Sequence, residues 1–222
     1  MARLPQTASR RADQAKRRKL EEYHRRRDFA DTPEPAGLGR EKPYPFEEPI
    51  FVVQKHRSRA LHYDFRIEVD GVLASWAVPK GPSPDPRQKR LAVRTEDHPL
   101  LYASFEGVIP QGQYGAGTVM VWDIGFYRLL GRGRQAVEHG TAGEQEAVAR
   151  GLEEGHVSIW LEGHKLRGGY SLTRMRDGRR EQWLLVKIRD GEARTGGDPV
   201  RTEPDSILTG RSLREVAGGS PP

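Results

Sequence analysis

The chain has 222 residues, with 37 Lys or Arg against 31 Asp or Glu and no cysteine. This length suits one sizeable core with tails, and the lack of cysteine excludes disulfides and thiolate-bound zinc, so any metal must be held by His and carboxylate groups. No apolar run is long enough to span a membrane and the start has no apolar secretory signal, so we expect a cytoplasmic protein with no membrane partner.

The net charge of +6 is concentrated at the start of the chain. Residues 1–27 hold ten basic and three acidic residues, whereas the remaining 195 hold 27 and 28. A basic arm favours a polyanion, most often nucleic acid, although a solubility tail has the same composition. We expect residues 1–20 to be a largely disordered arm, a helix to be possible within 11–27, and the Pro- and Gly-rich residues 28–45 to end it.

From Phe51 onward the chain alternates as strands do, and Asp70-Gly71 between two alternating runs predicts a hairpin. Residues 143–155 predict a helix, and residues 156–190 predict a three-strand meander. Counting the runs gives about seven or eight antiparallel strands, which favours a compact barrel or sandwich with a few peripheral helices. A barrel would hold a ligand in its mouth. We expect this domain to span residues 21–190, and residues 191–222 to be a flexible tail or linker.

One predicted strand carries most of the chemistry. His62, Asp64 and Arg66 alternate with apolar residues and therefore share one face, and Gln54 and His56 lie two apart on the preceding strand. Two imidazoles and one carboxylate suit Mn, Fe, Zn or Co better than Ca or Mg. The alternative is that these residues are hydrogen-bonded polar groups of the core.

Further polar residues suit an anionic substrate. The alternating residues 90–98 predict a strand with Arg90, Glu96 and His98 on one face. His98 could donate a proton or stabilise a phosphoryl group, although a surface His is the simpler interpretation. Arg66, Lys80 and Arg90 lie on or beside strands and match phosphate oxygens, or are solvated charges. The Gly-rich residues 107–118 predict a tight loop with positive φ rather than a phosphate loop, because no Lys-Ser/Thr pair or helix follows.

Several long motifs resemble the 3′-phosphoesterase module of DNA ligase D, which belongs to prokaryotic non-homologous end joining. They are YHRRRDFADTPEP, FVVQKHRSRALHYDFRIEVDGVLASWAVPKGPS, KRLAVRTEDHPLLYASFEGVIPQGQYGAGTVMVWD, GHKLRGGYSLTRM and QWLLVKIRD. The resemblance covers about residues 21 to 190 and implies a compact β-barrel with outer helices. The stretch from Arg128 to Gly155 looks longer than the family's usual connection. Residues 206–216 resemble the segment that leads to a ligase domain, so the chain is either a stand-alone protein or a fragment.

The resemblance also implies roles for individual residues. His56, His62 and Asp64 would bind a divalent metal, usually manganese. The catalytic and phosphate-site positions would be His98, Arg66, Lys80, Arg90 and Gln54. The lead-in positions would be Arg27, Asp28 and Glu34, folded back onto the body, and Glu96 and Tyr102 match further motif positions.

The implied activity is manganese-dependent trimming of DNA 3′ ends at primer-template junctions. A terminal ribonucleoside is removed to leave a 3′-phosphate, which is then hydrolysed to a 3′-OH for ligation. The implied partners are a DNA ligase and end-joining factors such as Ku, and the protein would be a nucleoid-associated monomer. Two alternatives remain: a non-catalytic module that binds DNA ends and recruits a ligase, and an Fe(II) oxygenase built on His62, Asp64 and His98.

Overall fold

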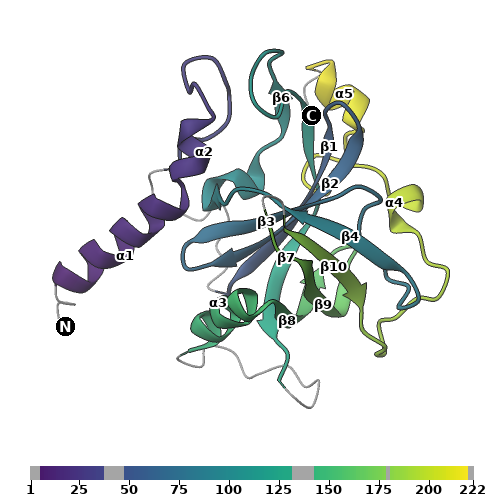
Figure 1. Cartoon of the computed structure of the whole chain (residues 1–222). Helices are drawn as coiled ribbons and strands as arrows, with labels where there is room; N and C mark the ends of the chain where they lie inside the picture. Colours follow the sequence, from purple (N-terminus) through teal and green to yellow (C-terminus); the bar gives the residue numbers. More distant parts are fainter. Residues whose placement is uncertain (1–5, 38–47, 132–142, 179–180, 220–222) are drawn as a thin grey trace.

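A closed barrel of eight antiparallel strands forms the centre of the molecule (Figure 1). The computed structural model describes residues 6–37, 48–131, 143–178 and 181–219. The barrel closes because β1 (Ile50–Arg57) pairs with β2 (Leu61–Val69) on one side and with β7 (Gly117–Leu129) on the other. The other barrel strands are β3 (Val72–Val78), β4 (Lys89–Arg94), β8 (His156–Gly163), β9 (Arg167–Arg176) and β10 (Gln182–Lys187). Their order, β1-β2-β3-β4-β10-β9-β8-β7, confirms the predicted fold class.

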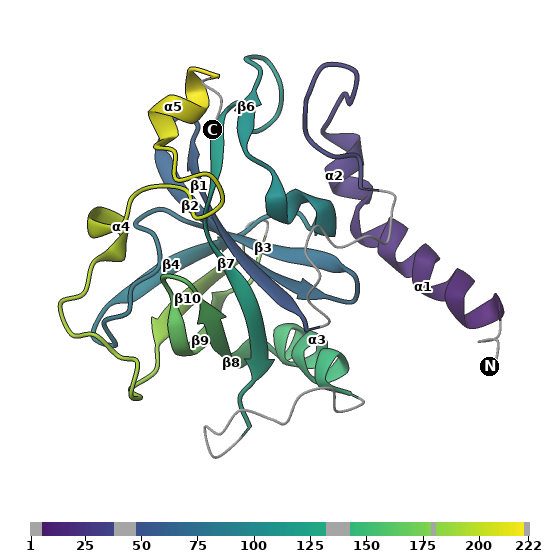
Figure 2. The ribbon, with the colours of Figure 1, turned by 180° about the vertical axis from the view of Figure 1, so that it is seen from behind.

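Short elements decorate the outside of the barrel. They are α1 (Gln6–Lys19), α2 (Glu21–Arg25), β5 (His98–Pro99), the 3-10 helix η1 (Leu100–Ser104), β6 (Gly107–Ile109), α3 (Glu144–Glu154), α4 (Pro199–Thr202) and α5 (Leu213–Ala217). Both views place α1 and α2 on the opposite side of the barrel from α4 (Figure 1 and Figure 2). None of the helices in the described ranges has the length and apolar character needed to cross a membrane.

The β2–β3 hairpin confirms the turn predicted from sequence. Val69 pairs with Val72, which leaves Asp70 and Gly71 as a two-residue loop with φ angles of 51° and 77°. Positive φ at both central residues is the type I′ geometry, whose twist matches the twist of the strands it joins. This turn fixes the register that places alternate side chains of β2 on opposite sides of the sheet.

Two apolar clusters occupy the two sides of the barrel wall. The inner cluster takes side chains from all eight strands, including the fully buried Phe65, Trp76 and Trp183. The outer cluster packs Leu20 and Tyr23 of the N-terminal region and residues of η1 against the outer faces of β1, β3 and β7. The lead-in, which we define as residues 20–37, therefore covers part of the outer wall.

The C-terminal segment corrects a prediction, because the sequence indicated a flexible tail or linker from residue 191. In the structure Leu213 and Val216 of α5 belong to the inner cluster, and the Ile207 amide donates to the Val121 carbonyl at 3.0 Å. Ser212 and Glu215 form a capping box at the start of α5. The Gly- and Pro-rich composition of the segment indicated a flexible tail, but α5 is a short amphipathic helix that anchors it.

The described part of the N-terminal arm is helical. α1 begins at Gln6, earlier than the helix predicted as possible within residues 11–27, and Leu20 and Tyr23 are buried. Lys19 Nζ lies 2.7 Å from the Asp70 carboxylate at the β2–β3 turn. Residues 1–5, 38–47 of the Pro-rich segment and 132–142 of the long connection lie outside the described residues.

Candidate functional site

The polar face of β2 lies on the outside of the barrel. Tyr63, Phe65 and Ile67 belong to the inner cluster, so the alternating His62 and Asp64 face outward. The sequence predicted this division into two faces, but it placed the site in the barrel mouth. That placement is wrong, because tightly packed apolar side chains fill the barrel interior and leave the outer wall for the polar groups.

Three potential metal ligands converge on this outer wall. β1 pairs with β2 so that His56 lies opposite His62 and two pairs away from Asp64. One ligand atom from each of His56, His62 and Asp64 lies within 4.8 Å of the others. His56 Nδ1 is 3.5 Å from Asp64 Oδ2, and His62 Nε2 is 3.6 Å from Asp64 Oδ1.

The hydrogen bonds of both rings suit a bound cation. His56 Nε2 donates to the Gly115 carbonyl at 2.9 Å, and His62 Nδ1 donates to the Ala60 carbonyl at 3.1 Å. In a neutral ring the other nitrogen then carries a lone pair, and both lone pairs face the Asp64 carboxylate. Three acceptors aimed at one point suit a cation between them, and a backbone carbonyl on the remote nitrogen is the usual support of a metal-bound histidine. The donor set therefore fits a divalent metal.

Arg66 connects this cluster to a second one. Its Nη2 donates to Asp64 Oδ2 at 3.1 Å and its Nε donates to Gln54 Oε1 at 2.8 Å. The Gln54 amide nitrogen donates in turn to the carbonyls of Tyr102 and Phe105, each at 3.0 Å, which fixes the oxygen toward Arg66. Although burial opposes the charged carboxylate, the Arg66 guanidinium holds the pKa of Asp64 well below its usual range. Asp64 is thus ionised and ready to bind a cation.

His98 is buried on the far side of Arg66. Its Nδ1 lies 2.9 Å from Arg66 Nη1, which can only donate, and 2.9 Å from the Glu96 carbonyl, which can only accept. Its Nε2 lies 3.4 Å from Arg27 Nη2. Burial, followed by the charges of Arg66 and Arg27, lowers the pKa of His98 well below its usual value. The ring is therefore neutral at neutral pH, with one N–H to donate.

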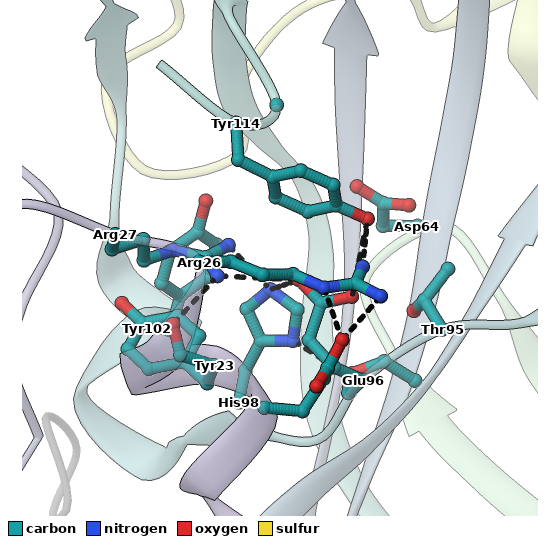
Figure 3. A network of polar contacts seen from close by, with 12 residues as sticks. Tyr23, Arg26, Arg27, Asp64, Thr95, Glu96, His98, Tyr102 and Tyr114 are labelled. Atoms are coloured by element: carbon teal, nitrogen blue, oxygen red, sulfur yellow. Dashed lines mark hydrogen bonds and ion pairs between the residues drawn. The ribbon is translucent and has the colours of Figure 1, made fainter.

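The lead-in closes the other side of the site, as the sequence predicted (Figure 3). Arg27 is buried, and it bonds to Glu34 Oε1 at 2.9 Å and to Glu96 Oε1 at 3.2 Å. Tyr102 donates its hydroxyl proton to Glu34 Oε1 at 2.9 Å, and burial together with Glu34 raises the pKa of Tyr102. Glu34 and Glu96 thus join the lead-in to the barrel through Arg27.

Most of these groups line one cavity of about 1480 Å³. Its walls include the ligand cluster, Arg66, His98 and the loop of residues 111–117. The lining also includes exposed basic residues, namely Arg25 of α2, Arg57 at the end of β1 and Arg59 of the β1–β2 turn. A polar cavity with several guanidinium groups suits a phosphate-bearing ligand.

Five predicted site residues do not line this cavity. Gln54 and Glu34 are bonded to the lining residues Arg66 and Arg27, respectively. Lys80 is exposed in the turn after β3, and Arg90 lies on β4 opposite Leu185 with its guanidinium bonded to Gln88. Asp28 caps the turn that follows α2, accepting from the Ala30 amide at 3.0 Å. The alternation of residues 90–98 predicted that Arg90 and His98 share one strand face. That prediction is wrong, because β4 ends at Arg94 and His98 belongs to the separate strand β5.

Two residues that the sequence did not single out lie in the site. Arg26 bonds to Glu96 Oε2 at 3.2 Å and to the Tyr114 hydroxyl, and its guanidinium lies 4.5 Å from the Tyr114 ring centre. The signal for Tyr114 was available, because it is the aromatic residue in a Gly-rich loop. Gly112, Gly115 and Gly117 all have positive φ, as predicted for that loop.

Fold and site together define a small β-barrel protein with a candidate metal centre beside an arginine–histidine cluster. A model of the DNA Ligase D 3′-phosphoesterase domain matches residues 54–174, and the chain belongs to this family. It is 50% identical over 199 residues to the Multifunctional non-homologous end joining protein LigD of Pseudomonas aeruginosa, covering 87% of this chain and 22% of that protein.

More distant relatives have similar names. The Multifunctional non-homologous end joining DNA repair protein LigD of Mycobacterium tuberculosis is 40% identical over 172 residues, covering 78% of this chain and 20% of that protein. The corresponding protein of Mycolicibacterium smegmatis is 38% identical over 177 residues, covering 78% and 21%. The chain spans about a fifth of the length of these curated relatives.

Proposed function

We propose that the chain is a manganese-dependent DNA 3′-end phosphoesterase. It removes 3′-terminal ribonucleosides and 3′-phosphates at primer-template junctions and leaves 3′-OH ends. Membership of the 3′-phosphoesterase family supports the reaction class, and the names of the relatives support a role in end joining. A DNA ligase and Ku would then act on the same ends.

One observation carries the proposal more than any other. His56, His62 and Asp64 aim three acceptor atoms at one point, beside the buried pair of Arg66 and His98. When bound there, a divalent metal would supply a Lewis acid that draws charge from the phosphorus.

The residues around that point have complementary tasks. Arg66 holds Asp64 and His98 in place and uses its remaining N–H groups for the phosphate oxygens. His98, as a neutral ring, gives a hydrogen bond to the departing oxygen rather than a positive charge. Arg27 supplies a second buried guanidinium, held ready by Glu34 and Glu96. Preorganised donors of this kind stabilise charge that develops during reaction without having to move.

The test is a 5′-labelled primer-template that ends in one ribonucleotide, incubated with and without manganese. We expect the primer to shorten by one nucleoside and then to lose its 3′-phosphate, only with the metal, and neither product with His62→Ala or His98→Ala. Full activity of both variants would remove the site assignment. Binding of the end without any product would favour the end-binding alternative. The oxygenase alternative required His98 in the ligand cluster, and among the described residues the cluster contains His56 instead.

Lys80 and Arg90 are tested in the same assay. Neither residue lines the cavity. The variants Lys80→Ala and Arg90→Ala therefore distinguish a contact with the substrate from a contribution to protein stability alone. Loss of activity with unchanged thermal unfolding would support their predicted catalytic function.

A further inference from the structure

Tyr114 occupies a distinctive position at the edge of the cavity. Among the described residues, the large hydrophobic side chains that are exposed are Leu61, Leu91, Val108, Tyr114, Met175 and Leu208. Tyr114 is the aromatic member of this set, is 45% exposed, and lines the cavity that contains the ligand cluster.

The position of the Tyr114 ring is fixed from several directions (Figure 3). Its hydroxyl accepts from Arg26 and lies 3.5 Å from Glu96 Oε2. The guanidinium of Arg26 lies 4.5 Å from the ring centre and that of Arg27 lies 5.6 Å from it. The next residue, Gly115, accepts the hydrogen bond from the ligand-cluster residue His56. The ring is therefore held at the cavity that the ligand cluster also lines, although the two are far apart in sequence.

The position of the Tyr114 ring suits contact with the base at a nucleic-acid end. Ionic groups around the cavity suit the phosphate, but they offer nothing to the flat faces of a base. An exposed aromatic ring on a fixed loop provides such a surface, and stacking of this kind tolerates any base. A terminal nucleoside presents a base at the site, whereas a terminal phosphate presents none.

We propose that Tyr114 binds the base of the 3′-terminal nucleoside by stacking and so favours nucleoside-bearing ends over ends that carry only a phosphate. This inference rests on the proposed function and deepens it, because it assigns a specificity residue for one of the two activities. Arg26 and Glu96 act as positioning residues that hold the ring through its hydroxyl.

The experiment compares three primer-template ends: a terminal ribonucleoside, a terminal ribose that lacks its base, and a terminal phosphate. For the wild-type chain we expect kcat/KM to be about tenfold lower for the base-less end than for the complete ribonucleoside. Tyr114→Ala should lower removal of the ribonucleoside by about tenfold, and should change removal of the base-less ribose and of the phosphate by less than about twofold. Tyr114→Phe keeps the ring and should keep most of the preference.

Each other outcome has a clear meaning. Equal losses on all three ends would overturn the inference and would make Tyr114 a structural residue, and thermal unfolding of the variant reports such a role. Equal wild-type rates with and without the base would overturn it without the use of any variant. A wild-type chain that processes none of the ends would overturn the proposed function itself, and the inference with it.

Discussion

The two sides of the cavity are built in different ways. On the barrel side, His56, His62 and Asp64 sit on paired strands whose register is fixed along their length and whose inner faces pack in the core. On the lead-in side, Arg27 and Glu34 depend on a few buried polar contacts and on a short helix. The comparison indicates that the barrel wall provides rigid ligand geometry, whereas the lead-in completes the site as a separately attached part.

The largest expected effect concerns the barrel side. His62→Ala removes one ligand atom, and we expect a loss of at least about 100-fold in kcat on both ribonucleoside and phosphate ends, because the metal contributes several kcal/mol to the reaction. The fold should survive, since His62 lies on the outer face. His156→Ala is the matched control, because His156 is an exposed β8 residue that does not line the cavity. Similar losses in both variants would contradict the assignment.

The next effect concerns the attachment of the lead-in. Glu34→Ala leaves the buried Arg27 without its closest carboxylate, which costs about 3 kcal/mol. We expect faster hydrogen exchange in the lead-in, with unchanged exchange in β8 and β9. Glu21→Ala, which changes an exposed residue of α2, should leave both regions unchanged. If the barrel strands lose protection together with the lead-in, the two sides form one cooperative unit and the comparison fails.

The buried imidazole of His98, between the barrel side and the lead-in side, should make the free energy of unfolding depend on pH. The folded pKa of His98 lies well below its ordinary value of about 6.5, so between these two values the unfolded chain takes up a proton that the folded chain does not. The free energy of unfolding should therefore fall as pH drops below about 6.5. His98→Gln should reduce this fall by about 1 kcal/mol between pH 7.5 and 5.5, as measured by urea unfolding. Parallel profiles for variant and wild type would show that another group is responsible.

The smallest effect concerns α1, beyond the lead-in. Arg17 and Arg18 are exposed on this helix and suit phosphates of the DNA backbone. Replacing both with Gln should reduce the slope of the logarithm of the DNA-binding constant against the logarithm of salt concentration by up to about 2. The rate at which bound substrate is converted should change little. An unchanged slope would make the basic arm a solubility feature.

The sequence predicted those features that depend on local periodicity. Alternation in β2 separated His62 and Asp64 from Phe65, Asp70-Gly71 marked the hairpin, and residues 143–155 marked α3, because each signal lies within a few neighbouring residues. The family resemblance then predicted that Arg27 and Glu34 would fold onto the body.

Features that depend on the whole sheet could not be predicted in this way. Parity defines two faces but does not say which face points inward, so the site was placed in the barrel mouth. Arg90 was grouped with His98 because the alternation of side chains was assumed to continue through Thr95–Asp97, but the strand ends at Arg94. The anchoring of α5 depends on Leu213 and Val216 meeting a core built from distant strands.

The most direct test of the central claim is a titration of the metal-free chain with manganese, followed by electron paramagnetic resonance of the free ion. We predict one bound ion per chain for the wild type and for His156→Ala, and none at the same concentrations for Asp64→Asn. Equal binding by Asp64→Asn, or no stoichiometric binding by the wild type, would contradict a metal centre formed by His56, His62 and Asp64.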